Sequence, residues 1–202
     1  TQPCRWEYLL TEATRPSDPL VLEEDERFSY LLSAKDLCLI EHLPEIMASG
    51  AASVKIEGRM KSSYYVAVVT RTYRQAIDTF MQNQNNYRFN RSWMEELQKV
   101  SHRGYTTGFA FTQEKITETS PDIKNIQTHE PAGIVLGYDD NQKRVLIEVR
   151  NHLKTGDTVD LLLPDKTFST DTQTIFSADG HQIGQAHAGN QVFFPLPFPA
   201  PK

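Results

Sequence analysis

The chain has 202 residues, of which 39% are hydrophobic and 23% charged, and its formal net charge is -5. This is the composition of an ordinary globular protein with one or two domains. No apolar run is as long as a membrane-spanning helix, which needs about 20 residues. The strongly basic composition typical of nucleic-acid-binding proteins is also absent. The scarcity of cysteine and the lack of a secretion signal indicate a reducing compartment, so we expect a cytoplasmic protein without membrane contact.

A polar stretch at 113–131 is the predicted boundary between two domains of different class. It contains prolines and shows neither helical nor strand periodicity. Helical patterns occur only before it, whereas strand and turn patterns dominate after it. We therefore predict an α/β domain over 1–118, a linker over 119–131 and an all-β domain over 132–202.

The first domain alternates helical and strand patterns. Ser33 and Asp36 form the capping pattern of a helix start. The first predicted element is a helix that starts at 33–36, with Leu37, Ile40 and Leu43 facing inward. It is followed by a short helix over 44–50, a strand over 53–57, and helices over 62–82 and 91–100. The helix over 62–82 has an apolar stripe made of Val66, Val69, Tyr73, Ile77 and Phe80.

The second domain has short strand patterns separated by turn signals at near-regular spacing. Asp139-Asp140-Asn141, Gly156-Asp157 and Asp179-Gly180 are typical turn sequences. The predicted strands are 132–138 and 144–149, which form a hairpin, followed by 158–164, 167–170, 173–177 and 191–194. This spacing predicts a small antiparallel barrel.

The most concentrated polar cluster is Lys-Ile-Glu-Gly-Arg-Met-Lys at 55–61. Strand alternation directs Lys55 and Glu57 to the same side, and Gly58 permits a sharp bend before Arg59. A lysine and a glutamate on a short buried strand each need a charged partner. The cluster is either an acid/base pair with an anion-binding arginine or a structural ion pair beside a surface loop, and spacing alone favours neither.

Two further groups have weaker signals. His102 and Arg103, beside a glycine-punctuated loop, either bind a carboxylate or phosphate or complement a helix C-terminus that Gly104 caps, and the second interpretation is favoured. Arg71 and Arg74 on the long helix are interpreted as a solvated face.

Cysteine and histidine offer no complete ligand set. Cys4 and Cys38 are too few for a closed metal or iron–sulfur site, which needs about four ligands. Lone cysteines are most often small core residues. His129, His152, His181 and His187 show no ligand spacing and are interpreted as surface residues.

Several long motifs resemble one known family. They are Pro-Cys-Arg-Trp-x-Tyr at 3–8, Leu-Ser-Ala-Lys-Asp-Leu-Cys-Leu-Ile at 32–40, the cluster at 55–61 with the Tyr-Arg at 73–74, and His-Arg-Gly-Tyr-Thr-x-Gly-Phe at 102–109. Together they resemble the collagenase-like peptidase family U32. The Gly156-Asp157 turn and the Leu-Leu-Leu-Pro run at 161–164 are similar to its C-terminal domain, a small barrel akin to the second domain of translation elongation factors.

The resemblance implies a function and a set of site residues. Some bacterial relatives close to this pattern hydroxylate the tRNA wobble uridine to 5-hydroxyuridine, with prephenate as a required metabolite, and others in the family serve ubiquinone or ribosomal RNA hydroxylation. By this resemblance the catalytic residues are Lys55, Glu57 and Arg59, and the substrate-binding residues are Arg5, Lys61, His102, Arg103 and Tyr105. The alternatives are a collagenase-like peptidase acting on a peptide, or a fragment whose barrel is only a binding module.

The resemblance also implies a cofactor that this chain cannot complete. Full-length relatives are expected to hold a [4Fe-4S] cluster, to which Cys4 and Cys38 are possible contributors only in the full-length protein. Residues 1–118 correspond to the last portion of the family's barrel-like catalytic domain, and the chain begins at Thr1 rather than methionine. We therefore expect this chain to be a fragment or processed product that holds no cluster and is inactive alone. We also expect an exposed barrel edge, which would favour strand pairing between two copies of the chain.

Overall fold

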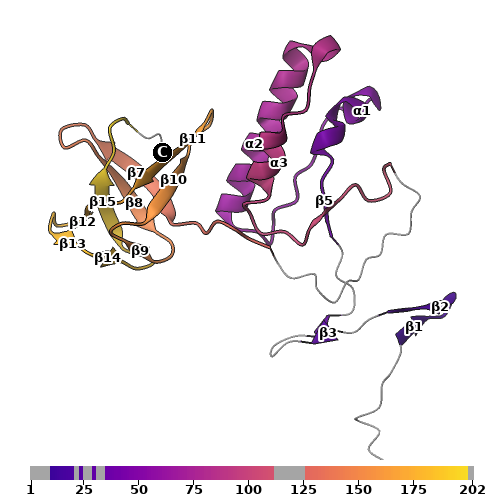
Figure 1. Ribbon diagram of the computed structural model, residues 1–202, viewed down its shortest axis with the longest axis horizontal. Helices are drawn as coiled ribbons and strands as arrows, with labels where there is room; N and C mark the ends of the chain where they lie inside the picture. Colours follow the sequence, from indigo (N-terminus) through magenta and orange to yellow (C-terminus); the bar gives the residue numbers. More distant parts are fainter. Residues whose placement is uncertain (1–9, 21–22, 25–28, 31–34, 112–125, 200–202) are drawn as a thin grey trace, which may run out of the picture. The chain divides into compact units, whose positions relative to one another are not determined.

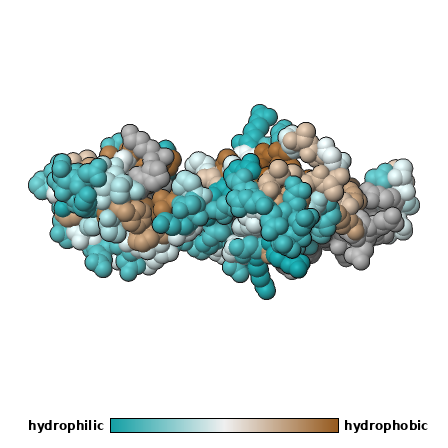
Figure 2. Space-filling view, turned by 90° about the horizontal axis from the view of Figure 1, so that it is seen from above, coloured by the Kyte–Doolittle hydropathy of each residue, from teal (hydrophilic) through white to brown (hydrophobic). Residues whose placement is uncertain are grey.

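The computed structural model describes residues 10–20, 23–24, 29–30, 35–111 and 126–199 (Figure 1). Cys4, Arg5 and Ser33 lie outside these ranges. The chain forms two compact units: Thr1–Lys55 with Phe80–Thr128, and Ile56–Thr79 with His129–Lys202. Within the described ranges, no helix combines the length and apolar character needed to cross a bilayer. Hydrophilic residues cover most of the face drawn in Figure 2, with smaller apolar patches among them.

The N-terminal region contains short antiparallel ladders that the sequence patterns did not predict. β1 (Leu10–Glu12) pairs with β2 (Arg15–Leu20), and β3 (Glu23–Glu24) pairs with β4 (Ser29–Tyr30). The carboxylate of Glu12 accepts hydrogen bonds from the backbone N–H of Thr14 at 3.0 Å and from its hydroxyl at 2.5 Å. β2 contains two prolines, which are unusual in strands, so alternation alone does not identify it.

A parallel pair of two-residue strands joins distant parts of the first unit. β5 (Asp36–Leu37) lies beside β6 (Tyr105–Thr106). The backbone N–H of Asp36 donates to the Gly104 carbonyl, and that of Cys38 donates to Thr106, both at 2.9 Å. The predicted helix start is therefore wrong at Asp36, and Leu37 is 64% exposed instead of inward. Pairing with a segment distant in sequence overrides the local capping pattern here.

The short helix of the first unit follows β5. A 3₁₀ turn, η2 (Ile40–His42), leads into α1 (Leu43–Ala48), and both Ile40 and Leu43 are fully buried. Pro44 lies in the first turn of α1, and Gly50 follows its end with a φ of 82°, which favours glycine. The predicted short helix is confirmed.

The long helix is α2 (Ser63–Gln82), which confirms the prediction over 62–82. The predicted stripe is confirmed at Val69 and Phe80, which are 7% and 9% exposed, and is wrong at Val66, which is 40% exposed. The buried face also includes Val68, Thr72 and Ala76, which are almost completely buried. These positions recur every four residues, and the Thr72 hydroxyl donates to the Val68 carbonyl at 2.7 Å. The buried face therefore holds a threonine without leaving its hydroxyl unsatisfied.

Aromatic rings pack around the second helix of the first unit. After η3 (Gln84–Asn86), α3 (Arg91–Leu97) begins at Asn90, whose side chain accepts from the Ser92 N–H at 3.0 Å. The helix confirms the core of the prediction over 91–100. Ring centroids are 5.4 Å apart for Phe80 and Tyr87, 6.2 Å for Tyr87 and Trp93, and 5.7 Å for Phe89 and Trp93. Trp93 is 5% exposed.

Tyr87→Phe is expected to preserve or raise the stability of the first unit. The buried Tyr87 hydroxyl has no hydrogen-bond partner among the described residues, and burial raises its pKa above the usual value. Removing it should add up to about 1 kcal/mol to the free energy of unfolding. Because the folded pKa is raised, the wild-type chain should lose stability as the pH rises above the tyrosine's unfolded pKa, and the variant should lack that loss. Urea unfolding monitored by Trp93 fluorescence at pH 8 and pH 11 measures the free energy of unfolding of both proteins. If Tyr87→Phe lowers that free energy by about 1 kcal/mol or more at pH 8, the hydroxyl must make a stabilising hydrogen bond, which would contradict this interpretation.

The β domain (described here over residues 129–199) is built from antiparallel ladders (Figure 1). Its main sheet has the order β13-β12-β15-β8-β7, and two further pairs are β10 with β11 and β9 with β14. The strands are β7 (Gly133–Asp139), β8 (Arg144–Val149), β9 (Leu153–Lys154), β10 (Thr158–Leu162), β11 (Thr167–Asp171), β12 (Ile175–Ser177), β13 (Gln182–Ile183), β14 (Gln185–Ala186) and β15 (Gln191–Pro195). The predicted all-β character and the β7–β8 hairpin are confirmed. Among the described strands, β7 and β13 end the main ladder, and no pairing closes it into a barrel.

Alternation along the strands places the core of the β domain. Val145, Ile147 and Val149 of β8 are at most 6% exposed, whereas the residues between them are half-buried. Val192 and Phe194 of β15 contribute to the same core. The β7–β8 turn is closed by the Asp139 carboxylate, which accepts from two backbone N–H groups. At the other end of β8, the backbone N–H of Arg150 donates to the Ala132 carbonyl at 2.9 Å, which holds the start of the loop that leads into β9.

Candidate functional site

The predicted catalytic cluster at 55–61 forms a surface bend in the structure. Lys55, Glu57 and Arg59 are all exposed, and no strand forms over 53–57. Glu57 Oε1 accepts from the backbone N–H of Arg59, and the Gly58 carbonyl accepts from that of Lys61, both at 3.0 Å. The predicted buried strand is wrong here because no described segment pairs with these residues.

Gly58 is required by close packing at this bend. A Cβ at this position would lie 2.9 Å from Cγ2 of Val66, closer than real side chains approach. The ammonium of Lys61 lies 4.9 Å from the centroid of the Tyr65 ring, a cation–π contact. The bend is therefore held against the first turns of α2, and it presents the Glu57 and Arg59 side chains to solvent.

His102, Arg103 and Tyr105 make structural contacts at and just before β6, and the Arg103 contact reaches β5. Arg103 Nη2 lies 3.1 Å from Oδ1 of Asp36, whose side chain is 14% exposed. His102 is 4% exposed and stacks on Tyr105 with ring centroids 4.4 Å apart. The Tyr105 hydroxyl donates to the Leu97 carbonyl at 2.6 Å. These contacts give each side chain a structural role, and their substrate contacts stay a prediction.

The backbone around His102 differs from the predicted helix end. Helix α3 ends at Leu97, and His102 instead pairs with Ile126 in an isolated antiparallel bridge. His102 Nδ1 accepts from the Gly104 N–H at 3.0 Å, so the neutral imidazole carries its proton on Nε2. Gly104 does have a φ of 80°, but at a turn before β6 and not at a helix end.

The residues present do not make up an iron–sulfur site. Cys38 is a half-buried cysteine beside β5, and the sequence contains two cysteines. Since a [4Fe-4S] cluster takes about four thiolate ligands, the chain can supply at most part of such a set. Across the described ranges, no three or more His, Cys, Asp or Glu side chains are grouped as a metal site would require.

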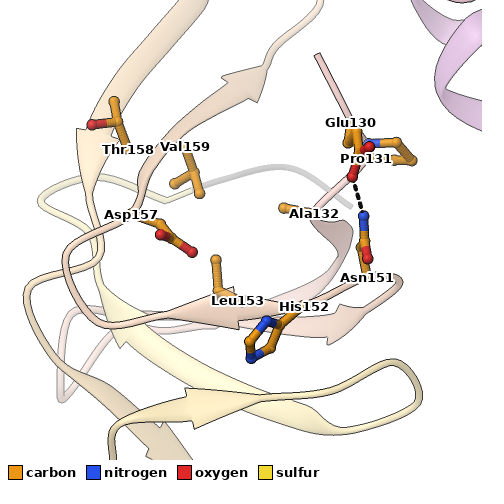
Figure 3. Close-up of a pocket in the computed structure, with 9 residues that line it drawn as sticks. All are labelled: Glu130, Pro131, Ala132, Asn151, His152, Leu153, Asp157, Thr158 and Val159. Carbon is orange, nitrogen blue, oxygen red and sulfur yellow. Dashed lines mark hydrogen bonds between the residues drawn. The ribbon is translucent and has the colours of Figure 1, made fainter. Parts of the chain in front are cut away.

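A pocket of about 220 Å³ opens in the β domain, where the segment entering β7 meets the loops before β9 and β10 (Figure 3). Leu153 and Val159 point into the space, with Asp157 on one side and Glu130 and Asn151 on the other. The Asn151 side-chain amide donates to Glu130, and Asp157 Oδ2 accepts from the Lys154 N–H at 2.7 Å. The remaining lining residues are Pro131, Ala132, His152 and Thr158.

The pocket has an apolar floor and an acceptor-rich rim. Two carboxylates and an amide border it, and no lysine or arginine is among its lining residues. Phosphate or carboxylate groups are repelled by such a rim, whereas amino groups that donate hydrogen bonds are favoured. None of the predicted catalytic or substrate-binding residues lines this pocket.

The histidines of the β domain lie at the surface, as predicted. His152 and His187 are exposed, and their rings stack with centroids 4.9 Å apart and an interplanar angle of 2°. His129 Nε2 lies 3.8 Å from an Asp160 carboxylate oxygen. His181 lies beside Asp179, whose pKa is lowered mainly by the hydrogen bond from Ser177 and in part by His181 itself. They form surface contacts next to the pocket and at the β12–β13 turn.

Comparison with known proteins gives consistent matches over both halves of the chain. The model of peptidase family U32 matches residues 1–120, and that of the peptidase family U32 C-terminal domain matches residues 127–202. The tRNA hydroxylation protein P1 of Bacillus subtilis is 34% identical over 197 residues, which are 95% of this chain and 46% of that protein. A collagenase from Porphyromonas gingivalis is 34% identical over 92 residues, 46% of this chain and 26% of that protein.

One solved structure is similar to about a third of the chain. It is the C-terminal domain of a U32 peptidase from Geobacillus thermoleovorans, 32% identical, with a TM-score of 0.34, and the match covers 36% of this chain and 90% of that one. The chain spans less than half the length of the Bacillus protein. With the family model covering residues 1–120, this chain belongs to peptidase family U32.

Proposed function

We propose that this chain is part of a U32 protein that hydroxylates the wobble uridine of tRNA to 5-hydroxyuridine in the cytoplasm. One observation carries this proposal: 34% identity to the Bacillus tRNA hydroxylation protein P1 extends over 95% of the chain, through the 55–61 bend and the β domain alike. A relationship confined to one domain would support only a shared module.

The exposed bend supplies charged groups to the site of the complete protein. Lys55 and Arg59 attract the carboxylates of a small dianionic metabolite such as prephenate, and Lys61 and Arg5 extend the positive charge along the sequence. Glu57 serves as the acid/base group, and its hydrogen bond from the Arg59 N–H orients the carboxylate. By the family resemblance, Arg103, His102 and Tyr105 are further substrate-binding residues in this proposal. A [4Fe-4S] cluster held by the complete protein would supply electron transfer.

The β domain has a separate role in this proposal, as the part that contacts tRNA. Its antiparallel ladders pack on one core, and the proposal takes from the family resemblance the likeness to the small barrel that forms the second domain of elongation factors. The acceptor-rich pocket favours exocyclic amino groups of unpaired bases over phosphates. The acidic charge of the domain is compatible with such base contacts, since phosphate contacts require cations.

Nucleoside mass spectrometry of bulk tRNA tests the proposal. Deleting the gene that encodes this chain should remove 5-hydroxyuridine and the nucleosides made from it, and restoring the gene should return them. Other tRNA modifications serve as the internal control, because their levels should not change. Unchanged 5-hydroxyuridine in the deletion strain would contradict the proposal.

A second candidate function is peptide hydrolysis, which the similarity to a collagenase over 46% of the chain favours. Gelatin cleavage by the purified complete protein, lost on Glu57→Gln, would establish it. We place it second because the match to the collagenase covers less than half of this chain.

A further inference from the structure

Arg71 of α2 binds the tip of the β10–β11 hairpin within the second unit. Its Nη1 donates to the Leu163 carbonyl at 3.0 Å, to the Lys166 carbonyl at 3.1 Å and to the Thr167 hydroxyl oxygen at 3.1 Å. Nη2 also donates to the Thr167 oxygen at 3.1 Å. One guanidinium therefore reaches both ends of the loop that joins β10 to β11.

The contact combines backbone carbonyls at both ends of the hairpin loop with one side chain, the hydroxyl of Thr167. The Leu163 N–H donates to the Lys166 carbonyl at 2.9 Å, which closes the same loop that Arg71 binds. One turn further along α2, the Gln75 amide donates to the Pro164 and Asp165 carbonyls at 3.3 and 3.4 Å. Backbone recognition depends on the length and shape of the loop, so the side chain of Asp165 is dispensable for it.

Arg74 provides a contrast on the same helix. It is exposed and pairs only with Asp78, at 2.5 Å and one turn away, among the contacts described for it. The predicted solvated face is therefore confirmed for Arg74 and wrong for Arg71, which is half-buried against the hairpin. The planar fork of the guanidinium suits Arg71 to bind oxygens at both ends of the loop, a fixed geometry that the compact ammonium of a lysine does not reproduce.

We propose that Arg71 is a positioning residue that fixes the β domain to α2, so that the β domain and the bend carrying Glu57 and Arg59 meet tRNA as one body. The compact second unit includes both parts, Ile56–Thr79 and His129–Lys202. The part of this inference that concerns tRNA rests on the proposed function. The binding of the β10–β11 hairpin by Arg71 does not depend on it. The hairpin sequence gives little sign of this role, because Thr167 is the one side chain among the acceptors described for Arg71 and the others are backbone carbonyls.

Hydrogen exchange of the whole 202-residue chain tests the docking. Arg71→Ala should raise the exchange rate of amides over 163–167 by about tenfold, because a local contact that closes the loop is lost. Arg74→Ala and Asp165→Ala should leave these amides unchanged. Arg71→Lys should remain close to Arg71→Ala, and combining Arg71→Ala with Thr167→Val should add little to Arg71→Ala alone. Unchanged exchange in Arg71→Ala, or full protection in Arg71→Lys, would overturn the assignment.

Binding of an unmodified tRNA transcript, followed by fluorescence anisotropy, tests the positioning role. Circular dichroism first verifies that each variant is folded. Arg71→Ala should then weaken tRNA binding by about fivefold. Arg74→Ala also removes one cation, but it should change the affinity less than about twofold. Equal losses in the two variants would show that only charge matters and would overturn the positioning role. If the wild-type chain binds no tRNA, the proposed tRNA contact of the β domain and the positioning role of Arg71 toward tRNA are both wrong. The hydrogen-exchange experiment still tests whether Arg71 binds the hairpin.

Discussion

Phe194→Ala is expected to lower the free energy of unfolding of the β domain by about 3–5 kcal/mol, the usual cost of removing a buried phenylalanine ring. Phe194 is 2% exposed and belongs to the core cluster formed by β8, β12 and β15. It lies directly opposite Val145, which is fully buried. Since small domains commonly have a stability of about 5–10 kcal/mol, this single change should leave the β domain close to its unfolding threshold.

Phe193→Ala is the matched control for this prediction. The neighbouring ring has the same size, but strand alternation directs it to the opposite face, where it is only half-buried between Leu146 and Phe176. Its loss should cost less than half as much. Urea-dependent hydrogen exchange of peptides from residues 129–199 measures both variants in the whole chain. Equal costs for the two phenylalanines would show that the core lies elsewhere.

The largest functional effect is expected at the exposed bend. In cells whose gene carries Arg59→Ala, 5-hydroxyuridine should fall by about 10- to 100-fold, because a hydrogen bond to a charged group is worth about 1.5–3 kcal/mol. Glu57→Gln should cause a comparable loss. The glutamine oxygen can still accept from the Arg59 N–H, so the bend is preserved and only the charge is removed. Mass spectrometry of tRNA nucleosides provides the measurement.

Two exposed residues outside the bend serve as controls. Glu41→Gln removes a carboxylate beside α1, and Arg74→Ala removes a guanidinium from the surface of α2. Both should retain normal 5-hydroxyuridine at matched protein levels. If Arg59→Ala retains it as well, the bend is a surface feature without a role in the reaction.

The parts of the fold that could be predicted are those with strong local signals. Helix α2 extends over twenty residues with continuous helical periodicity, and the β7–β8 hairpin has alternating strands around an Asp-Asp-Asn turn. β5 could not be predicted, because its partner lies almost seventy positions away and its own residues resemble a helix start. β2 was missed because prolines interrupt its pattern.

The candidate site was less predictable than the fold. The charged residues of the 55–61 cluster stand out in the sequence, but the sequence does not show that they lie at a surface bend. Glu130, Asn151 and Asp157 meet at one pocket only through the packing of separate loops. Arg71 likewise looks like any exposed helix arginine until the hairpin it binds is placed beside it. In each case the missing information is a contact between segments distant in sequence.

The central claim is that this chain takes part in wobble-uridine hydroxylation. The most direct test restores a deletion strain with the gene ending at Thr128, which removes the β domain, and with the intact gene at equal protein level. Our account predicts that the intact gene returns 5-hydroxyuridine to wild-type abundance and that the shortened gene returns almost none. Full abundance with the shortened gene would show that the β domain has no part in handling tRNA, and no return with either gene would contradict the assignment of the whole protein.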